Sequence, residues 1–232
     1  MESLDDYLAT LNMEGKRPVW KENESKIEGV YRRTRRFLKT GMNVCEIGVG
    51  NGYLLKNLLS AGFRTTGVDI SACLIQSMAS SLSRFGDNLH LIHGNIGTVG
   101  LGKGLFDIVF ALDVLEHLPD TALASAIGTI SDSLRVGGFL VATFPLNEKM
   151  AEGMTKCPEC GHVFHYVGHH QVFRSVRQFG ETLGSSFHIT SQFIVYARGL
   201  DGLAQRVYRV MVRILSKRAS APTLCVIARR VP

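Results

Sequence analysis

Short apolar runs alternate along this chain with segments in which apolar residues recur every three or four positions. The apolar runs are rich in β-branched and aromatic residues, and they predict strands at 43–48, 64–69, 89–93, 106–112 and 138–144. The periodic segments predict helices at 52–61, 71–84 and 119–134. Strands and helices that alternate in this way are typical of a parallel sheet covered by helices on both faces. The pattern therefore predicts a doubly wound α/β fold.

Both ends of the chain and one internal stretch depart from this alternation. Residues 1–40 are polar with a helical period, and we interpret them as an N-terminal helical segment in front of a domain that spans 41–232. Residues 146–172 have the composition of a loop and hold four of the eight histidines. The elements expected after this loop are a helix at 174–184, a strand at 188–196, a basic amphipathic helix at 200–218 and a strand at 223–228.

The composition is that of a globular protein, since 45% of the 232 residues are apolar and 20% are charged. No apolar run approaches the roughly 20 residues that cross a bilayer, and the N-terminus lacks the basic and then apolar pattern of a signal peptide. The five cysteines are an odd number and mostly lie in apolar surroundings, which indicates a reducing compartment. We therefore expect a cytoplasmic protein.

The net charge of +6 is concentrated near the C-terminus, where residues 198–232 contain eight basic residues and one acidic residue. The basic side chains that flank the apolar face of the predicted 200–218 helix are Arg206, Arg209, Arg213 and Lys217. Such a helix can bind an anionic membrane surface or a lipid-linked substrate, or it can dock on the domain with its arginines in water. Nucleic acid is not favoured, because no aromatic residues are interleaved with the basic ones.

A glycine-rich turn connects the first predicted strand to the first predicted helix. The turn runs Glu46-x-Gly48-x-Gly50-x-Gly52, and glycines at alternate positions let a backbone approach a nucleotide-like ligand closely. Asp69 ends the second predicted strand, where a carboxylate can accept both hydroxyl protons of a ribose. A dinucleotide dehydrogenase would carry G-x-G-x-x-G instead. An α/β domain in which this turn has no function is the remaining alternative.

Two further stretches follow in order, residues 106–118, which end in Asp113-Val114-Leu115-Glu116-His117-Leu118, and residues 134–140. Together with 46–52 and Asp69 they resemble the class I S-adenosylmethionine-dependent methyltransferases of the type 11/12 group. The resemblance is strong over 27–145 and general over 174–230. It implies a Rossmann-like sandwich with a seven-stranded, mostly parallel sheet whose last strand is antiparallel. It also implies S-adenosylmethionine as the cofactor.

The resemblance assigns roles to individual residues. Glu46 would hold the loop and the cofactor amine, Asp69 the ribose, and Asp113 would border the sulfonium. The cofactor-binding residues that it implies are Glu46, Gly48, Gly50, Gly52, Asp69, Ile70, Asn95, Ile96, Leu112 and Asp113. Asn95 stands where the family usually has an acidic residue, and its amide can still bond the adenine amine.

His117 is the candidate catalytic residue, because it follows the fourth strand and an imidazole titrates near neutrality. The alternative is that Glu116 and His117 only cap the next helix and line the pocket.

A second motif, Cys157-Pro158-Glu159-Cys160-Gly161, is typical of a turn that aims two thiolates at one metal ion. His165 and His169 lie four residues apart and would complete a tetrahedral, structural zinc site, with His162 and His170 as substitutes. This cluster resembles a small zinc loop of some bacterial methyltransferases. A surface loop with unrelated histidines and a redox C-x-x-C are the alternatives. We expect the zinc to shape the substrate pocket and to take no part in the chemistry.

The sequence thus predicts a methyltransferase that acts on a small molecule or on a lipid- or glycan-linked biosynthetic intermediate. Methylation of tRNA or protein is one alternative, although no Asn-Pro-Pro-Tyr-like tetrapeptide follows the fourth strand. A cofactor-binding adaptor without catalysis is another. The basic helix extends the expected location from the cytoplasm to the inner face of the membrane.

Overall fold

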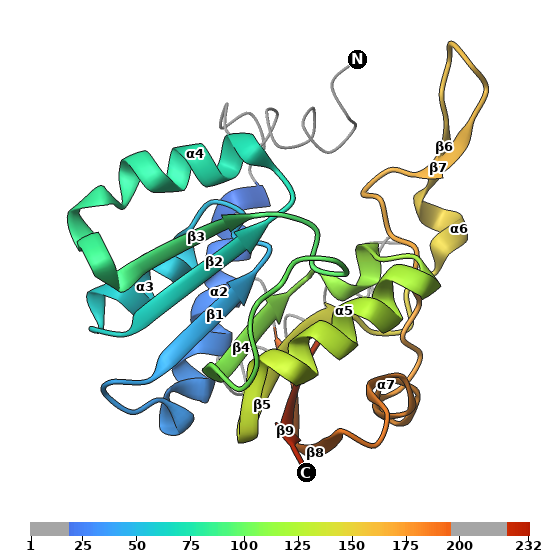
Figure 1. Cartoon of the computed structure of the whole chain (residues 1–232). Helices are drawn as coiled ribbons and strands as arrows, with labels where there is room; N and C mark the ends of the chain where they lie inside the picture. Colours follow the sequence, from blue (N-terminus) through green and yellow to red (C-terminus); the bar gives the residue numbers. More distant parts are fainter. Residues whose placement is uncertain (1–18, 196–221) are drawn as a thin grey trace, which may run out of the picture.

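The computed structural model describes residues 19–195 and 222–232, which form a seven-stranded sheet with helices on both faces and a small hairpin (Figure 1). The sheet order is β3-β2-β1-β4-β5-β9-β8. Its strands are β1 (Asn43–Ile47), β2 (Arg64–Asp69), β3 (Leu89–His93), β4 (Phe106–Leu112), β5 (Leu134–Pro145), β8 (Phe187–Val195) and β9 (Thr223–Arg230). All neighbouring strands are parallel except β9, which is antiparallel to β5 and β8. The predicted fold is confirmed.

Helices cover both faces because successive residues of a buried strand point to opposite sides. On β4, Ile108 packs in the core on the side of α2 and α3, whereas Val109 packs on the side of α5 and α7. The helices are α2 (Val19–Thr34), α3 (Tyr53–Ser60), α4 (Ala72–Ser81), α5 (Asp120–Ser133) and α7 (Val176–Leu183). The short 3-10 helices are η1 (Arg35–Phe37), η2 (Ser83–Asn88) and η3 (Leu115–His117).

Strand β5 begins at Leu134, directly after α5 and four residues before the predicted start. Gly137 and Gly138 therefore both lie in the interior of the strand. A Cβ atom on Gly138 would lie 2.9 Å from the carbonyl oxygen of Asp107, and the register of β4 against β5 shifts at this point. The two glycines permit a bulge and a close approach of two backbones. In sequence the same pair reads as the end of a helix.

The described part of the N-terminal segment is helix α2, which packs on the sheet through Val30. Val30 and Thr34 are fully buried, and the Thr34 hydroxyl donates a hydrogen bond to the carbonyl of Val30. Ile27 and Tyr31 pack beside them, so one face of α2 meets the core. Helix α2 therefore lies against the sheet and next to the ends of strands that carry the candidate site.

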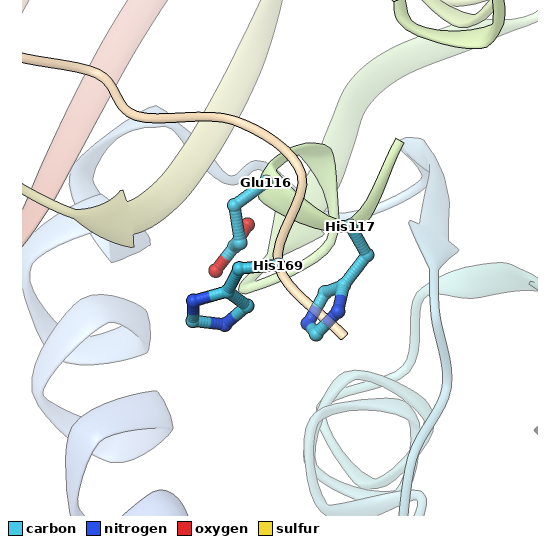
Figure 2. Close-up of side chains that lie close together, drawn as sticks. All are labelled: Glu116, His117 and His169. Atoms are coloured by element: carbon cyan, nitrogen blue, oxygen red, sulfur yellow. The ribbon is translucent and has the colours of Figure 1, made fainter. Parts of the chain in front are cut away.

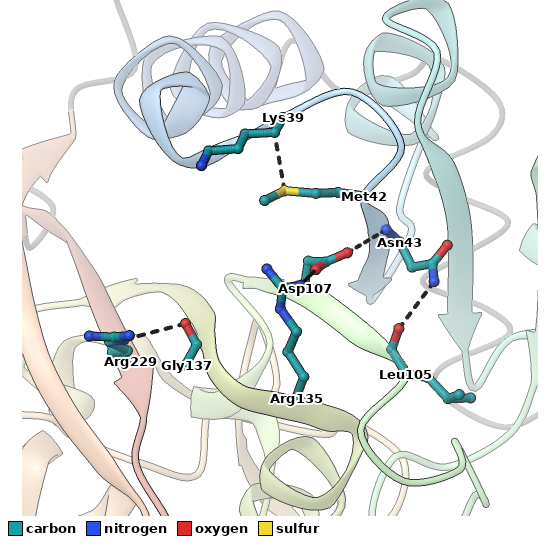
Figure 3. A network of polar contacts seen from close by, with 8 residues as sticks. All are labelled: Lys39, Met42, Asn43, Leu105, Asp107, Arg135, Gly137 and Arg229. Atoms are coloured by element: carbon teal, nitrogen blue, oxygen red, sulfur yellow. Dashed lines mark hydrogen bonds and ion pairs between the residues drawn. The ribbon is translucent and has the colours of Figure 1, made fainter.

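A polar network joins the starts of β1, β4 and β5, at the edge of the sheet opposite the glycine turn (Figure 3). The carboxylate of Asp107 accepts a hydrogen bond from the backbone N–H of Asn43 at 2.7 Å. Its other oxygen lies 2.6 Å from a guanidinium nitrogen of Arg135. The Asp107 carboxylate thus contacts residues of three strands. It fixes the register of these strands at the edge of the sheet opposite the site.

The predicted 146–172 loop contains structure of its own, namely α6 (Met150–Gly153), β6 (Met154–Lys156) and β7 (Val163–His165). The hairpin β6–β7 projects from the body of the protein (Figure 1). Met154 pairs with His165 at its base, and the backbone N–H of Cys157 donates to the carbonyl of His162 at its tip. The base thus lies next to α6, and the cysteine turn lies at the far end of the projection.

The predicted basic helix at 200–218 lies outside the described residues. Among the helices of 19–195 and 222–232, none is long and apolar enough to cross a membrane.

Candidate functional site

The glycine turn after β1 has a left-handed backbone conformation at each of its three glycines. Gly48, Gly50 and Gly52 have positive φ angles of 75°, 49° and 73°, a region that side chains disfavour. A Cβ atom on Gly48 would also lie 2.5 Å from Cγ2 of Val114, and one on Gly52 would overlap the sulfur of Met78. Neighbouring side chains therefore pack directly against the backbone of the turn. This backbone lies at the carboxyl edge of the sheet.

Asp69 at the end of β2 holds this turn in place. One carboxylate oxygen accepts the backbone N–H of Val49 and the other accepts that of Ser71, both at 2.9 Å. Burial raises the pKa of the Asp69 carboxyl, and the backbone hydrogen bonds oppose that rise. Each oxygen retains a second lone pair, so a ribose could still be bound there. The structure places Asp69 beside the glycine turn, as the sequence predicts.

Glu46 lies in β1, one residue before the strand ends, and is 3% exposed. Its carboxylate accepts the backbone N–H of Leu55 in the first turn of α3, but Oε2 has no hydrogen-bond partner among the described residues. Burial raises the pKa of this carboxyl well above its usual value. A buried, unpaired carboxylate oxygen next to the glycine turn fits the ammonium group of a methionine moiety. The residues present thus fit S-adenosylmethionine.

The residues predicted to bind adenine are placed differently from one another. Ile70 is 52% exposed beside Asp69, which suits contact with a flat ring. The amide oxygen of Asn95 accepts the backbone N–H of Gly97 at 2.8 Å and so closes its own loop. Ile96 is buried in the core and lines no open surface. The structure therefore brings Ile70 to the site, while the Ile96 side chain is used in packing.

Leu112 ends β4, and Asp113 follows it with a positive φ angle of 54°. The Asp113 carboxylate accepts the hydroxyl of Thr143 at 2.8 Å and forms a 2.6 Å ion pair with Lys26 of α2. Sequence reasoning found Asp113 but missed both partners. Lys26 is 87 residues away and Thr143 lies within an apolar strand, so no spacing in the sequence links them to Asp113.

His117 lies in η3, directly after β4, and its Nδ1 is 3.3 Å from the carbonyl oxygen of Gly168. Part of the ring reaches solvent, yet desolvation by the surrounding protein and then the charge of His169 lower the pKa of His117. The backbone carbonyl of Glu116 accepts the N–H groups of His170 and Gln171 at 2.7 and 3.0 Å. These bonds fix the segment after the hairpin against η3.

Two groups of metal-binding side chains meet at this point. Glu116, His117 and His169 form the first group, shown in Figure 2, and Glu148, His165 and His169 form the second. Within each group the ligand atoms lie within 4.8 Å of one another. His169 belongs to both groups. Sequence reasoning missed Glu148 entirely and gave Glu116 no ligand role, because both are common surface residues by composition.

The predicted zinc site of Cys157, Cys160, His165 and His169 is not formed. His165 lies at the base of the hairpin, and Cys157 lies three residues further toward the tip than the Met154 with which His165 pairs. Among the described residues, neither cysteine belongs to a group of three ligand atoms.

The cysteine turn itself is present at the hairpin tip. Backbone N–H groups of Cys160 and Glu159 bond the sulfur of Cys157 and lower the pKa of its thiol. His162, named as a substitute ligand, lies beside this turn, whereas His170 lies against η3.

Comparison with known proteins assigns the family. A family of methyltransferase domains matches residues 44–138. A ubiquinone biosynthesis O-methyltransferase of Aromatoleum aromaticum is 30% identical over 176 residues, which cover 69% of this chain and 74% of that protein. The chain belongs to the class I S-adenosylmethionine-dependent methyltransferases. This methyltransferase therefore has the fold that the resemblance implied.

Solved structures share the whole architecture of this methyltransferase. The 1,6-didemethyltoxoflavin N1-methyltransferase of Burkholderia thailandensis, solved with 1,6-didemethyltoxoflavin and S-adenosylhomocysteine, has a TM-score of 0.70 at 16% identity, over 98% of this chain and 87% of that one. An N-methyltransferase of Bradyrhizobium japonicum, in complex with S-adenosylhomocysteine, has a TM-score of 0.60 at 16% identity, over 93% of this chain and 89% of that one. At these identities the likeness shows the fold.

Proposed function

We propose that this methyltransferase transfers the methyl group of S-adenosylmethionine to a nucleophilic atom of a small organic molecule. The observation that carries the proposal is the buried Glu46 carboxylate, which has an unpaired oxygen beside a turn of three positive-φ glycines. Asp69 lies across that turn and holds it. The sulfonium is intrinsically electrophilic, so the protein's part is to align the acceptor with the methyl group.

The acceptor would bind at the ends of β4 and β5, where Asp113, His117 and the segment after the hairpin meet. Relatives support a small-molecule acceptor, since one is named for ubiquinone biosynthesis and a structural neighbour was solved with 1,6-didemethyltoxoflavin. A neutral imidazole at this place can take a proton from the acceptor or bind a metal ion. The residues around His117 decide between these roles.

A lipid- or glycan-linked acceptor is an extension of this proposal. It rests on the basic segment 200–218, which lies outside the described residues, and on its predicted affinity for anionic membranes. Vesicles of anionic and of neutral lipid should separate the two cases, because an Arg206, Arg209 and Arg213 triple variant should lose binding to the anionic vesicles alone. Equal binding of both proteins would leave the soluble small-molecule acceptor.

The cofactor site is tested by calorimetric titration with S-adenosylmethionine and S-adenosylhomocysteine. Asp69→Ala should abolish measurable binding, because it removes the ribose acceptor and releases the N–H groups of Val49 and Ser71. Asp132→Ala is the matched control, since this carboxylate is exposed on α5 and should leave the affinity unchanged. Wild-type protein that binds neither compound would overturn the proposal.

Transfer is tested with S-adenosylmethionine labelled in its methyl group. Hydroxylated aromatic compounds, lipid-linked sugars and bulk tRNA should be offered in parallel, and label should enter the first class. Label in tRNA would favour the alternative acceptor. Cofactor binding with no transfer to any class would favour the cofactor-binding adaptor.

A further inference from the structure

Glu116 is a buried carboxylate whose side chain has no partner within the described chain. It is 1% exposed, and neither of its oxygens has a hydrogen-bond partner. Burial, and then the charge of Asp113, raise the pKa of this carboxyl well above its usual value. A buried acid without partners destabilises a fold by about 1–3 kcal/mol, so its presence calls for a bound group. The side chain points toward His169 (Figure 2).

The two histidines beside Glu116 are held in one tautomer each. Nδ1 of His117 faces the carbonyl oxygen of Gly168 at 3.3 Å, and a carbonyl can only accept. Nδ1 of His169 lies 2.5 Å from Oε2 of Glu148 and donates to that carboxylate. In its neutral form each ring therefore carries its proton on Nδ1 and has the lone pair of Nε2 available. Metal-binding histidines usually show this arrangement, with the second nitrogen bonded to a carbonyl or carboxylate.

The second group cannot hold an ion between Glu148 and His169. Two ligand atoms that each lie about 2 Å from a metal are about 3.3 Å apart at a tetrahedral angle, and the Glu148–His169 contact is shorter than that. Glu148 thus orients His169, and the ring of His165 stacks on His169 with centroids 4.9 Å apart. The remaining three ligand atoms belong to Glu116, His117 and His169.

We propose that Glu116, His117 and His169 bind one divalent first-row transition metal ion, such as zinc, iron(II) or manganese(II), with Glu148 as the residue that positions His169. Two imidazoles and a carboxylate are suitable ligands for these ions. The site contains no thiolate and so differs from a zinc site built of cysteines. Three protein ligands leave at least one coordination position open. The ion uses the lone pair of His117 and therefore replaces that residue's predicted role as a base.

The site lies at the edge where the acceptor is proposed to bind, because η3 follows β4 directly after Asp113. An acceptor oxygen in the open position would have its pKa lowered by the ion. This consequence rests on the proposed methyl transfer. The ion itself does not, since its binding is measured without cofactor or acceptor.

Metal binding is tested on the full chain, without an affinity tag and stripped of metal. Zinc titrated into wild type should bind tightly, and the site should take up one zinc ion per chain. Cobalt(II) should give visible d–d bands typical of nitrogen and oxygen ligands. The double variant Cys157→Ser/Cys160→Ser should keep both signals, whereas His117→Ala and His169→Ala should lose them. His188→Ala, an exposed histidine on β8, is the matched control and should bind like wild type.

Two further variants separate binding from folding. Glu116→Gln removes the ligand charge but also the unpaired buried charge, so it should fold at least as well as wild type and still lose the ion. Glu148→Gln should weaken zinc binding by about 10–100-fold, as expected for a residue that orients a ligand.

Three results would overturn the proposal. The first is that wild type binds neither zinc nor cobalt. The second is that both His169→Ala and Glu116→Gln retain the ion. The third is that the cysteine double variant loses the ion while wild type shows a thiolate-to-cobalt charge-transfer band. The last would place the metal at the hairpin tip. Titration with S-adenosylmethionine in the same preparations keeps the two proposals apart, because failure of the metal site leaves cofactor affinity intact.

Discussion

Nζ of Lys26 lies 2.6 Å from Oδ2 of Asp113, so a side chain of the N-terminal helix α2 closes an ion pair at the end of β4. The lysine side chain is 19% exposed and the aspartate side chain 33%. Thr143 of β5 donates to the other oxygen of the same carboxylate. Three elements that are distant in sequence are thereby joined beside the proposed acceptor position. Helix α2 thus contributes a side chain to the surroundings of this proposed position.

Lys26→Ala should lower both stability and transfer. Loss of a partly buried, charge-assisted contact should reduce the free energy of unfolding by about 1–2 kcal/mol, and the freed Asp113 should lower the rate of methyl transfer. Chemical unfolding and the transfer assay measure the two effects. Lys149→Ala is the control, because its ion pair with Glu152 is exposed and should contribute at most about 0.5 kcal/mol. Equal effects of the two variants would contradict the role given to Lys26.

Glu46→Gln should stabilise the cofactor-free protein and weaken cofactor binding. Because burial raises the pKa of Glu46 in the folded state above its unfolded value, the folded protein binds more protons between those two pKa values. Its stability therefore falls as the pH rises through this window. The amide removes that fall, and at neutral pH the gain should be about 1–3 kcal/mol.

Urea unfolding at several pH values between 4 and 8 measures this effect, and calorimetry measures the loss of S-adenosylmethionine affinity. Asp132→Asn makes the same carboxylate-to-amide change at an exposed position and should alter neither quantity. If Glu46→Gln destabilised the cofactor-free protein at neutral pH, Oε2 of Glu46 would have a partner and the argument would fail.

Gly48→Ala should be more damaging than Gly50→Ala, although both glycines have a positive φ angle. At Gly50 nothing lies within 4 Å of an added Cβ, so only backbone strain of about 1 kcal/mol is expected. At Gly48 the same strain is joined by a collision with Val114. Thermal unfolding should show the larger loss for Gly48→Ala. Adding Val114→Ala should recover part of it, and no recovery would show that the collision is relieved in another way.

Asp107→Ala should cost more stability than Arg135→Ala (Figure 3). Removal of the carboxylate leaves the backbone N–H of Asn43 without an acceptor at the start of β1, which should cost about 1–3 kcal/mol. The Arg135 side chain is 54% exposed, and its loss should cost less than about 1 kcal/mol. Urea unfolding compares the two. The reverse order would show that the ion pair, and not the backbone bond, fixes these strand ends.

The fold was predictable because each element carries its own periodic signal. The apolar run at 106–112 and the spacing of 119–134 predict β4 and α5 nearly to the residue. The glycine turn and Asp69 were predictable as well, because the ends of neighbouring parallel strands meet at one edge of the sheet. The start of β5 was predicted four residues too late, since glycines such as Gly137 and Gly138 occur both in a bulge inside a strand and at the end of a helix.

The sequence by itself thus determined the α/β architecture, the position of Asp69 beside the glycine turn, and the presence of histidines and cysteines after β5. Only the tertiary structure decided which of these residues meet. The hydrogen bonds of His170 and Gln171 to the carbonyl of Glu116 bring His169 to Glu116 and His117, while the hairpin carries Cys157 away. Glu116 comes from η3, and Glu148 and His169 come from opposite ends of the 146–172 insertion. Their approach depends on how a 27-residue insertion docks on the sheet, since 146–172 has no periodic pattern that could predict it.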